Sequence, residues 1–156
     1  MNVRVTEESG RSYGITRVIE VGPSIASLAT MLTGINPGGL HSCAIDSTQS
    51  LFCWGYNGNG NVGDGTTASR ISPVLVGGTG NFAQVATGHA HSCALTTAGA
   101  AFCGGRSNRG ELGDGTQTDR FVPTAVLGGL TFTSIDVGYN HSCGITANGV
   151  AYCWGG

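Results

Sequence analysis

Residues 88–105 read GHAHSCALTTAGAAFCGG, and the same pattern returns elsewhere in the chain at a fixed distance. The triplet HSC at 91–93 also occurs 50 residues earlier and 50 residues later, followed each time by FCWG, FCGG or YCWG. Residues 41–90 and 91–140 are identical at 18 of 50 positions. Identity at that level marks an internal repeat, and a repeat of this length is typical of solenoids, propellers and other arrays.

Each repeat contains four short runs that favour β strands. In the second copy these runs begin near Pro73 (PVLV), Phe82 (FAQVAT), His91 (HSCALT) and Ala101 (AFCGG), and glycines or polar residues separate them. The chain has 28 glycines and only 10% charged residues, which suits short strands joined by tight turns. We therefore expect an all-β fold of β-propeller blades, each with four antiparallel strands.

The period also sets the expected domain organisation. Because proline cannot donate to a sheet ladder, Pro73 fits the first residue of an edge strand, and each blade is taken to begin at the matching proline. We expect one domain of three blades, as a partial propeller or one completed by an oligomer. Residues 1–22 do not match the repeat, and we expect a capping strand or hairpin there. The predicted blades are 23–55, 73–105 and 123–155, and the predicted linkers are 56–72 and 106–122.

The six cysteines occupy the same two positions in every repeat. If the third and fourth strands of a blade form a hairpin with Cys43 opposite Cys53, then Ile45 lies opposite Leu51 and the turn centres on Thr48. Directly opposed residues of antiparallel strands lie within reach of a disulfide. Six cysteines allow many pairings, but each blade should pair its own two. The expected disulfides are Cys43–Cys53, Cys93–Cys103 and Cys143–Cys153.

A metal site is the alternative interpretation of these residues. His41, Cys43 and Cys53 offer three ligands in one repeat, whereas tetrahedral zinc takes four and the chain has no C-x-x-C pair. We therefore favour disulfides and expect no metal. Disulfides persist in oxidising compartments, so we expect a secreted, extracellular or cell-surface protein. The N-terminal residues MNVRVTEESG lack the apolar core of a secretory leader, so we expect another export route or a segment of a longer exported protein.

Composition argues against several other classes of protein. The net charge is −2 and the seven cationic residues are all arginine, so the dense basic face that nucleic-acid binding needs is missing. Asp64 and Asp114 each lie in GDGT, and one carboxylate per loop suits a turn better than a calcium site. The glycine-rich runs lack the lysine of a phosphate loop. We expect no cofactor, no nucleic acid and no membrane span.

The repeat resembles the regulator of chromosome condensation family of propellers. The resemblance rests on GHAHSCALTTAG at 88–99, FCWG at 52–55 and a glycine-rich stretch that leads to LGDGT at 112–116. The cysteine-paired form looks like copies found in exported bacterial proteins. The resemblance implies blades that close a ring and, by analogy alone, a guanine-nucleotide-exchange regulator. The chromatin-contacting basic elements of the family's best-known member have no counterpart here, so the resemblance implies the blade and not the partner.

A histidine precedes each first cysteine by two residues, at His41, His91 and His141. A cysteine–histidine pair can be catalytic, but three identical copies without a recurring orienting group favour a structural hydrogen bond to a neighbouring loop. We therefore expect a protein that is not an enzyme. The expected function is a non-catalytic protein-interaction module of an exported protein, and the alternative is a structural subunit of an extracellular assembly or filament.

The two predicted linkers share GDGT and an arginine, while most of their other residues differ. Varied tips on a fixed frame suit a binding surface. We expect a protein partner or self-association, with a homo-oligomer or a longer propeller covering the exposed blade faces. The candidate partner-binding residues are Tyr56, Asn57, Asn59, Asn61, Arg70, Arg106, Asn108, Arg109, Glu111 and Arg120.

Overall fold

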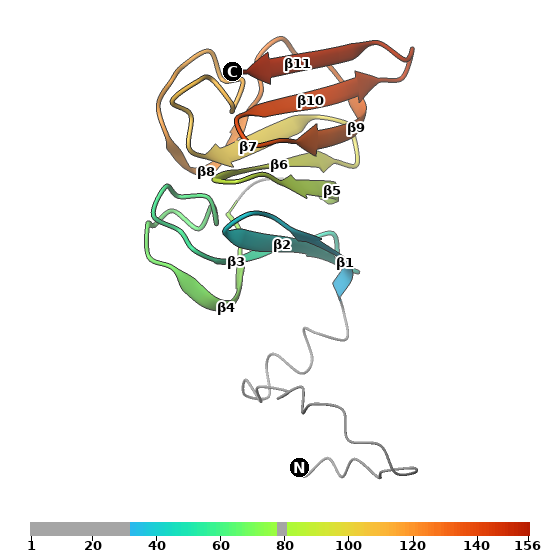
Figure 1. The fold of residues 1–156 in the computed structure, drawn as a ribbon. Helices are drawn as coiled ribbons and strands as arrows, with labels where there is room; N and C mark the ends of the chain where they lie inside the picture. The colour runs from blue at the N-terminus through green and yellow to red at the C-terminus, as the bar shows by residue number, and fades with distance from the viewer. Residues whose placement is uncertain (1–31, 78–80) are drawn as a thin grey trace, which may run out of the picture.

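The structure is a computed structural model that describes residues 32–77 and 81–156 (Figure 1). These residues form eleven β strands in three antiparallel sheets, and no helix occurs among them. The predicted all-β fold with blade-like sheets is therefore confirmed. The predicted cap at 1–22 lies outside the described residues.

The strands of each sheet follow one another in chain order. The first sheet contains β1 (Leu32–Pro37), β2 (His41–Asp46), β3 (Leu51–Gly55) and β4 (Arg70–Leu75). The second sheet contains β5 (Phe82–Thr87), β6 (His91–Thr96), β7 (Ala101–Gly105) and β8 (Arg120–Ala125). The third sheet contains β9 (Phe132–Val137), β10 (His141–Thr146) and β11 (Ala151–Gly155).

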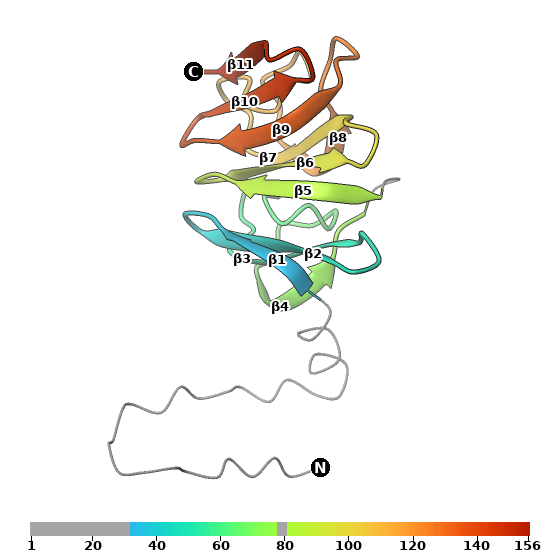
Figure 2. The same ribbon diagram turned by 90° about the vertical axis from the view of Figure 1, so that its right-hand side faces the viewer.

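The sheets stack in chain order, and Figure 2 shows β1, β5 and β9 following one another along one side of the stack. Polar side chains connect these first strands. Asn36 Oδ1 accepts a hydrogen bond from the Thr87 amide at 2.9 Å. The Gln84 side chain donates to the Ile135 carbonyl at 2.9 Å and accepts from its amide at 3.2 Å. Consecutive sheets are therefore hydrogen-bonded to one another as well as packed.

The pairing of β4 corrects the predicted blade boundaries. Leu75 lies opposite Phe52 and Arg70 lies opposite Gly55, so the proline-containing strand closes the first sheet rather than opening the second. β8 pairs with β7 in the same way. The proline does mark an edge strand, but an edge strand can belong to the sheet on either side of it. Most of each predicted linker, 56–69 and 106–119, therefore connects two strands inside one sheet.

The central hairpins have the predicted register. Cys43 lies opposite Cys53, and Ile45 lies opposite Leu51. The other two repeats pair their cysteines in the same way, and the Cα atoms of each pair are 4.1 Å apart. Each blade therefore carries one disulfide across its central hairpin, as the repeat predicts.

The hydrophobic cores lie between consecutive sheets and repeat with the same period. In the first core, Cys43, Ile45 and Leu51 of the first sheet pack with Phe82 and Val85 of the second. Adding 50 to each number gives the second core, between the second and third sheets. Its corresponding members are Cys93, Leu95, Ala101, Phe132 and Ile135. One kind of junction is therefore built twice.

Candidate functional site

A histidine from each of the first two sheets bonds to a serine of the next sheet. His41 Nε2 lies 2.5 Å from Ser92 Oγ, and His91 Nε2 lies 3.0 Å from Ser142 Oγ. The Ser92 hydroxyl donates to the main-chain carbonyl of Asn61 at 3.2 Å, and the second serine donates to a loop carbonyl in the same way. Because each hydroxyl proton is used in this bond, the histidine Nε2–H donates to the serine oxygen.

Burial keeps both of these histidines neutral. It lowers the pKa of His41 to about 4, and the nearby rings of His91 and His89 lower it further. Burial also lowers the pKa of His91 to about 4, and the charge of Arg106 adds to this effect. Nδ1 of each ring is buried without a hydrogen-bond partner in the part of the chain that the structure describes. The arrangement therefore lacks the third, orienting group of a catalytic triad.

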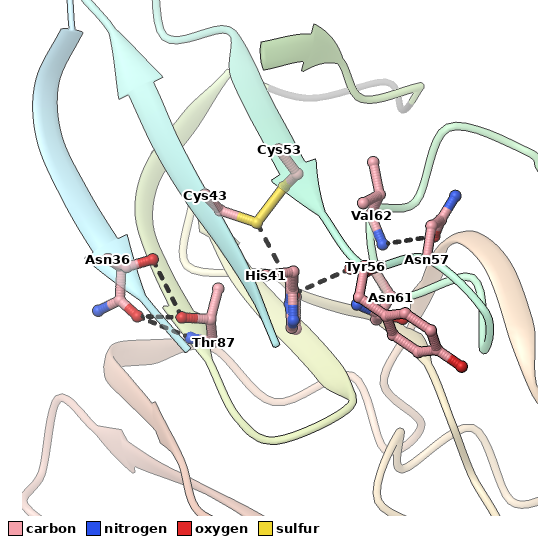
Figure 3. The surroundings of a disulfide bond; sticks show 10 residues. Asn36, His41, Cys43, Cys53, Tyr56, Asn57, Asn61, Val62 and Thr87 are labelled. Carbon is pink, nitrogen blue, oxygen red and sulfur yellow. Dashed lines mark hydrogen bonds between the residues drawn. A yellow bond between two sulfur atoms is a disulfide. The ribbon is translucent and has the colours of Figure 1, made fainter. Parts of the chain in front are cut away.

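The repeated histidine thus makes a hydrogen bond between sheets. Figure 3 shows His41 beside the Cys43–Cys53 disulfide, where the first and second sheets meet. We expected this histidine to bond to a neighbouring loop. Its direct partner is instead Ser92 of the next sheet, and the Ser92 hydroxyl in turn donates to the loop carbonyl of Asn61. His141 occupies the same position in the third sheet, but its side chain is exposed.

The GDGT motifs fix the long loops of the first two sheets. Asp64 Oδ1 accepts hydrogen bonds from the Thr66 amide and hydroxyl, and Asp64 Oδ2 lies 2.5 Å from Arg70 Nε. Partial burial raises the pKa of Asp64, but the bonds from Thr66 and Arg70 outweigh it and hold the pKa below its usual value. Asp114 and Arg120 repeat the pair at 2.7 Å. Arg70 and Arg120, two of the four arginines expected to bind a partner, therefore serve first to close their own loops.

Three other candidate residues are buried, which corrects their predicted role in binding. Asn57 Oδ1 accepts from the Val62 amide, and Asn61 donates to the Tyr56 carbonyl. Glu111 Oε2 accepts from a loop amide at 2.7 Å. These polar groups satisfy the backbone of the two long loops, which fold inward, so they cannot face a partner. The buried Val62 in this otherwise polar loop is the sequence signal for that inward fold.

The remaining candidates lie at one end of the stack. This loop end consists of residues 38–40, 56–69, 88–90, 106–119 and 138–140. Tyr56, Asn108 and Arg109 are exposed there, and Asn59 and Arg106 are half-buried. The loops support one another through backbone bonds, for example from the Tyr56 amide to the Leu40 carbonyl. The structure therefore brings together the tips of both long loops.

Two aromatic side chains at the loop end were not predicted as binding residues. The rings of His89 and Tyr139 stack with centroids 4.2 Å apart and planes inclined by 21°. The Tyr139 side chain is 60% exposed. Arg106 Nη2 donates to Asn140 Oδ1, one residue further along. His89 and Tyr139 occupy the same position of successive repeats, where the first repeat has Gly39, so the repeat pattern did not single them out.

A shallow depression of about 600 Å³ lies at the opposite end of the sheets. Its lining includes Ala83, Thr97 and Thr133, and no titratable side chain contributes to it. General acid–base chemistry needs such a side chain within hydrogen-bond reach of the substrate. The loop end is therefore the better candidate for a functional surface.

The repeats match known family models. The model described as "Regulator of chromosome condensation (RCC1) repeat" matches residues 50–95. A second model with the same description matches residues 37–61 and 132–156. The chain belongs to the RCC1 repeat family. The matched residues include the HSC and cysteine–glycine motifs that form the central hairpins.

Several solved structures share this fold, and each of the four comparisons below covers 80% of the chain. Human WBSCR16 superposes with a TM-score of 0.75 at 23% identity. Two structures of yeast RCC1 (Prp20) give TM-scores of 0.71 and 0.68 at 25% and 26% identity. The ectodomain of the receptor kinase CR4 from Physcomitrella patens gives 0.54 at 27% identity.

The chain corresponds to only part of each of these proteins. It covers 33% of human WBSCR16, 32% and 33% of the two yeast chains, and 30% of the CR4 ectodomain. No curated protein matches the sequence. The chain therefore spans about a third of the length of these structures, and the likeness shows its fold.

In the part of the chain that the structure describes, no helix could span a membrane. No group of three or more histidine, cysteine or acidic side chains is placed to hold a metal ion among residues 32–77 and 81–156. All six cysteines are engaged in the three disulfides.

Proposed function

We propose that this chain is a protein-interaction module whose RCC1 repeats present the loop end to a protein partner. The observation that carries the proposal is that Tyr56, Arg109 and Tyr139 are all exposed at the loop end, where the two long loops have a buried, hydrogen-bonded base. Tyrosine and arginine are enriched among the residues that dominate binding energy at protein interfaces.

The rigidity of the loops supports this proposal. Each long loop is closed by an aspartate–arginine pair, and the buried Asn57 or Glu111 satisfies backbone groups beneath its tip. A tip held in this way loses little conformational entropy when it binds, so more of the contact energy contributes to affinity. Protein binding also fits the relatives, because yeast Prp20 is described in complex with Kap60 and as binding Gsp1p and histones.

We also propose that the module works outside the cytoplasm, in an exported or cell-surface protein. The support is chemical, since three disulfides in one small domain require an oxidising environment to form and persist. The likeness to the ectodomain of a receptor kinase, at 27% identity, points the same way. Partners would then be other extracellular proteins or a second copy of the chain.

Competition for cross-linking tests the role of the loop end. Protein with a photoreactive group at Asn108 is used to capture proteins from the extracellular fraction of the source cells. Excess unlabelled wild-type protein should remove the cross-links, whereas a Tyr139→Ala/Arg109→Ala double variant should not. Thr97→Ala, at the opposite end of the sheets, is the matched control and should compete as well as wild type. Equal competition by the double variant would contradict the proposal.

A further inference from the structure

We propose that the loop end binds an acidic segment of a protein partner, and that arginine side chains at its surface bind the carboxylates of that segment. This rests on the function proposed above and adds the chemistry of the partner. Two features of the described residues support it: the place of the charged side chains in the fold, and the depth at which each of them lies.

Every arginine that the structure describes lies in the loop end or at its edge. Arg106 and Arg109 belong to the second long loop, and Arg70 and Arg120 are the first residues of β4 and β8, directly after the two long loops. Within residues 32–77 and 81–156, the one exposed acidic residue is Asp136 in β9. The accessible positive groups are therefore gathered at one end of the stack.

The acidic side chains of the long loops lie deeper than the arginines that pair with them. The Arg70 side chain is 34% exposed, and its partner Asp64 is 7% exposed. The corresponding values for Arg120 and Asp114 are 36% and 4%. The charges of each pair balance, but a partner that approaches from solvent meets the guanidinium groups before the carboxylates. Such layering favours a partner that carries negative charge.

The exposure of these arginines does not depend on the sheet that follows. The first long loop is covered by β8 of the following sheet, where the Phe121 carbonyl accepts a hydrogen bond from the Gly65 amide at 2.8 Å. The second long loop has no such cover, because the third sheet contains only the three described strands β9 to β11. Arg70 and Arg120 are nevertheless almost equally exposed. Contact with a following sheet therefore leaves the guanidinium accessible.

Each of these guanidinium groups keeps donors for a further carboxylate. Arg70 donates from Nε to Asp64 at 2.5 Å and from Nη2 to the Thr66 hydroxyl at 3.2 Å, and Arg120 makes the same two bonds 50 positions later. Nη1 of both side chains has no bond to the described residues, and an arginine can bind a carboxylate through two N–H groups at once. Because the inner bonds already hold the side chain, its binding to a partner costs less conformational entropy.

An acidic protein segment fits this surface better than nucleic acid does. The chain has a net charge of −2 and no lysine, whereas nucleic-acid binding draws its affinity from many phosphate contacts. A few guanidinium groups lie here at the same end as the exposed rings of Tyr56 and Tyr139, and Arg109 adds an exposed cation at the tip of the second long loop. A short segment can place carboxylates on the arginines and apolar groups on the rings.

Fluorescence anisotropy with a labelled peptide of alternating glutamate and glycine tests the chemistry of the partner. This peptide should bind at least roughly tenfold more tightly than the peptide with glutamine in place of glutamate, since several arginines contribute. Its affinity should fall when salt rises from about 0.1 M to about 1 M, because the Debye length shortens from about 10 Å to about 3 Å. Equal affinity for the two peptides, no detectable binding, or tighter binding of an oligothymidine of the same charge would overturn the proposal.

Two variants locate the binding. Asp114→Asn/Arg120→Gln replaces one pair by neutral side chains of similar size and leaves the net charge unchanged, and it should weaken binding of the glutamate peptide by roughly two- to fivefold. Arg109→Gln should have a similar effect. Thr97→Glu, at the opposite end of the sheets, is the control, because it changes the net charge by the same amount as Arg109→Gln and should leave the affinity unchanged. An equal loss in the control, or unchanged affinity in both arginine variants, would contradict the role of the loop end.

The cross-linking competition separates this inference from the function proposed above. If wild-type protein removes the cross-links but the glutamate peptide does not bind, the loop end binds a partner of different chemistry, and only the present inference fails. If the glutamate peptide binds and its excess also removes the cross-links, the captured partner uses the arginines as proposed.

Discussion

At the scale of single residues, the repeated histidine explains how three similar blades become one body. His41 and His91 are neutral rings that bridge two sheets beside a disulfide, and each bond ends on the backbone of a long loop. A buried polar group of this kind stabilises only while its partners remain in place. The same residue therefore joins the sheets and makes the joint sensitive to acid.

Stability should fall as the pH drops from about 6.5 to 4. The pKa of His41 and His91 is about 4 in the folded chain, below the ordinary histidine value of 6.5, so the unfolded chain binds more protons in this window. The two histidines therefore contribute stability that is present above pH 6.5 and lost as the pH falls through 4. The loss should reach on the order of 3 kcal/mol for each histidine.

Urea unfolding across this pH range measures the effect. His91→Gln keeps a side-chain N–H that can reach Ser142 but cannot be protonated, so it should flatten the pH dependence by about half. His141→Gln is the control, and at low protein concentration it should retain the wild-type slope because that ring is exposed. If the stability of the wild type did not change between these pH values, the conclusion that burial keeps His41 and His91 neutral would be wrong.

The buried asparagine of the first long loop gives a second test. Asn57 accepts a bond from the Val62 amide at 2.9 Å and donates to the carbonyls of Thr66 and Ala68. Asn57→Ala should therefore lower the free energy of unfolding by about 2–3 kcal/mol, since it leaves buried backbone groups unpaired. Asn59→Ala, two residues away in the same loop, should change it by less than about 0.5 kcal/mol. Equal effects in thermal unfolding would contradict the inward fold of the loop.

At the scale of strands and loops, the pairing of adjacent strands could be predicted from the sequence, but the sheet to which an edge strand belongs could not. The register of Cys43 with Cys53 follows from a hairpin of two adjacent strands, so sequence spacing was sufficient to predict it. The sheet that receives β4 depends on packing between blades, which a single proline cannot specify. Asn57 and Glu111 stand in glycine-rich polar runs that look solvent-exposed, and only their tertiary contacts show that they are buried.

The third hairpin should be the first to lose its disulfide. Cys153 is exposed and Cys143 is half-buried, whereas the other four cysteines are at most 1% exposed. A reductant must reach a sulfur atom to attack it, so access controls the order of reduction. Graded reduction of dilute protein, followed by alkylation and peptide mapping, should label Cys143 and Cys153 first. Simultaneous labelling of all three pairs would contradict the difference in burial.

At the scale of the whole molecule, a single junction repeated along the chain accounts for the way the three sheets stack. A histidine on one sheet donates a hydrogen bond to a serine on the next sheet, and apolar side chains of both sheets pack beside this bond. Each repeat thus carries both the histidine and the serine of this junction.

Histidine footprinting tests this junction most directly. Diethylpyrocarbonate modifies accessible imidazole rings, and mass spectrometry reads the extent at each residue. We predict that His41 and His91 stay unmodified in the folded protein, whereas His141 reacts. Modification of His41 or His91 in the folded protein as fast as that of His141 would contradict the account.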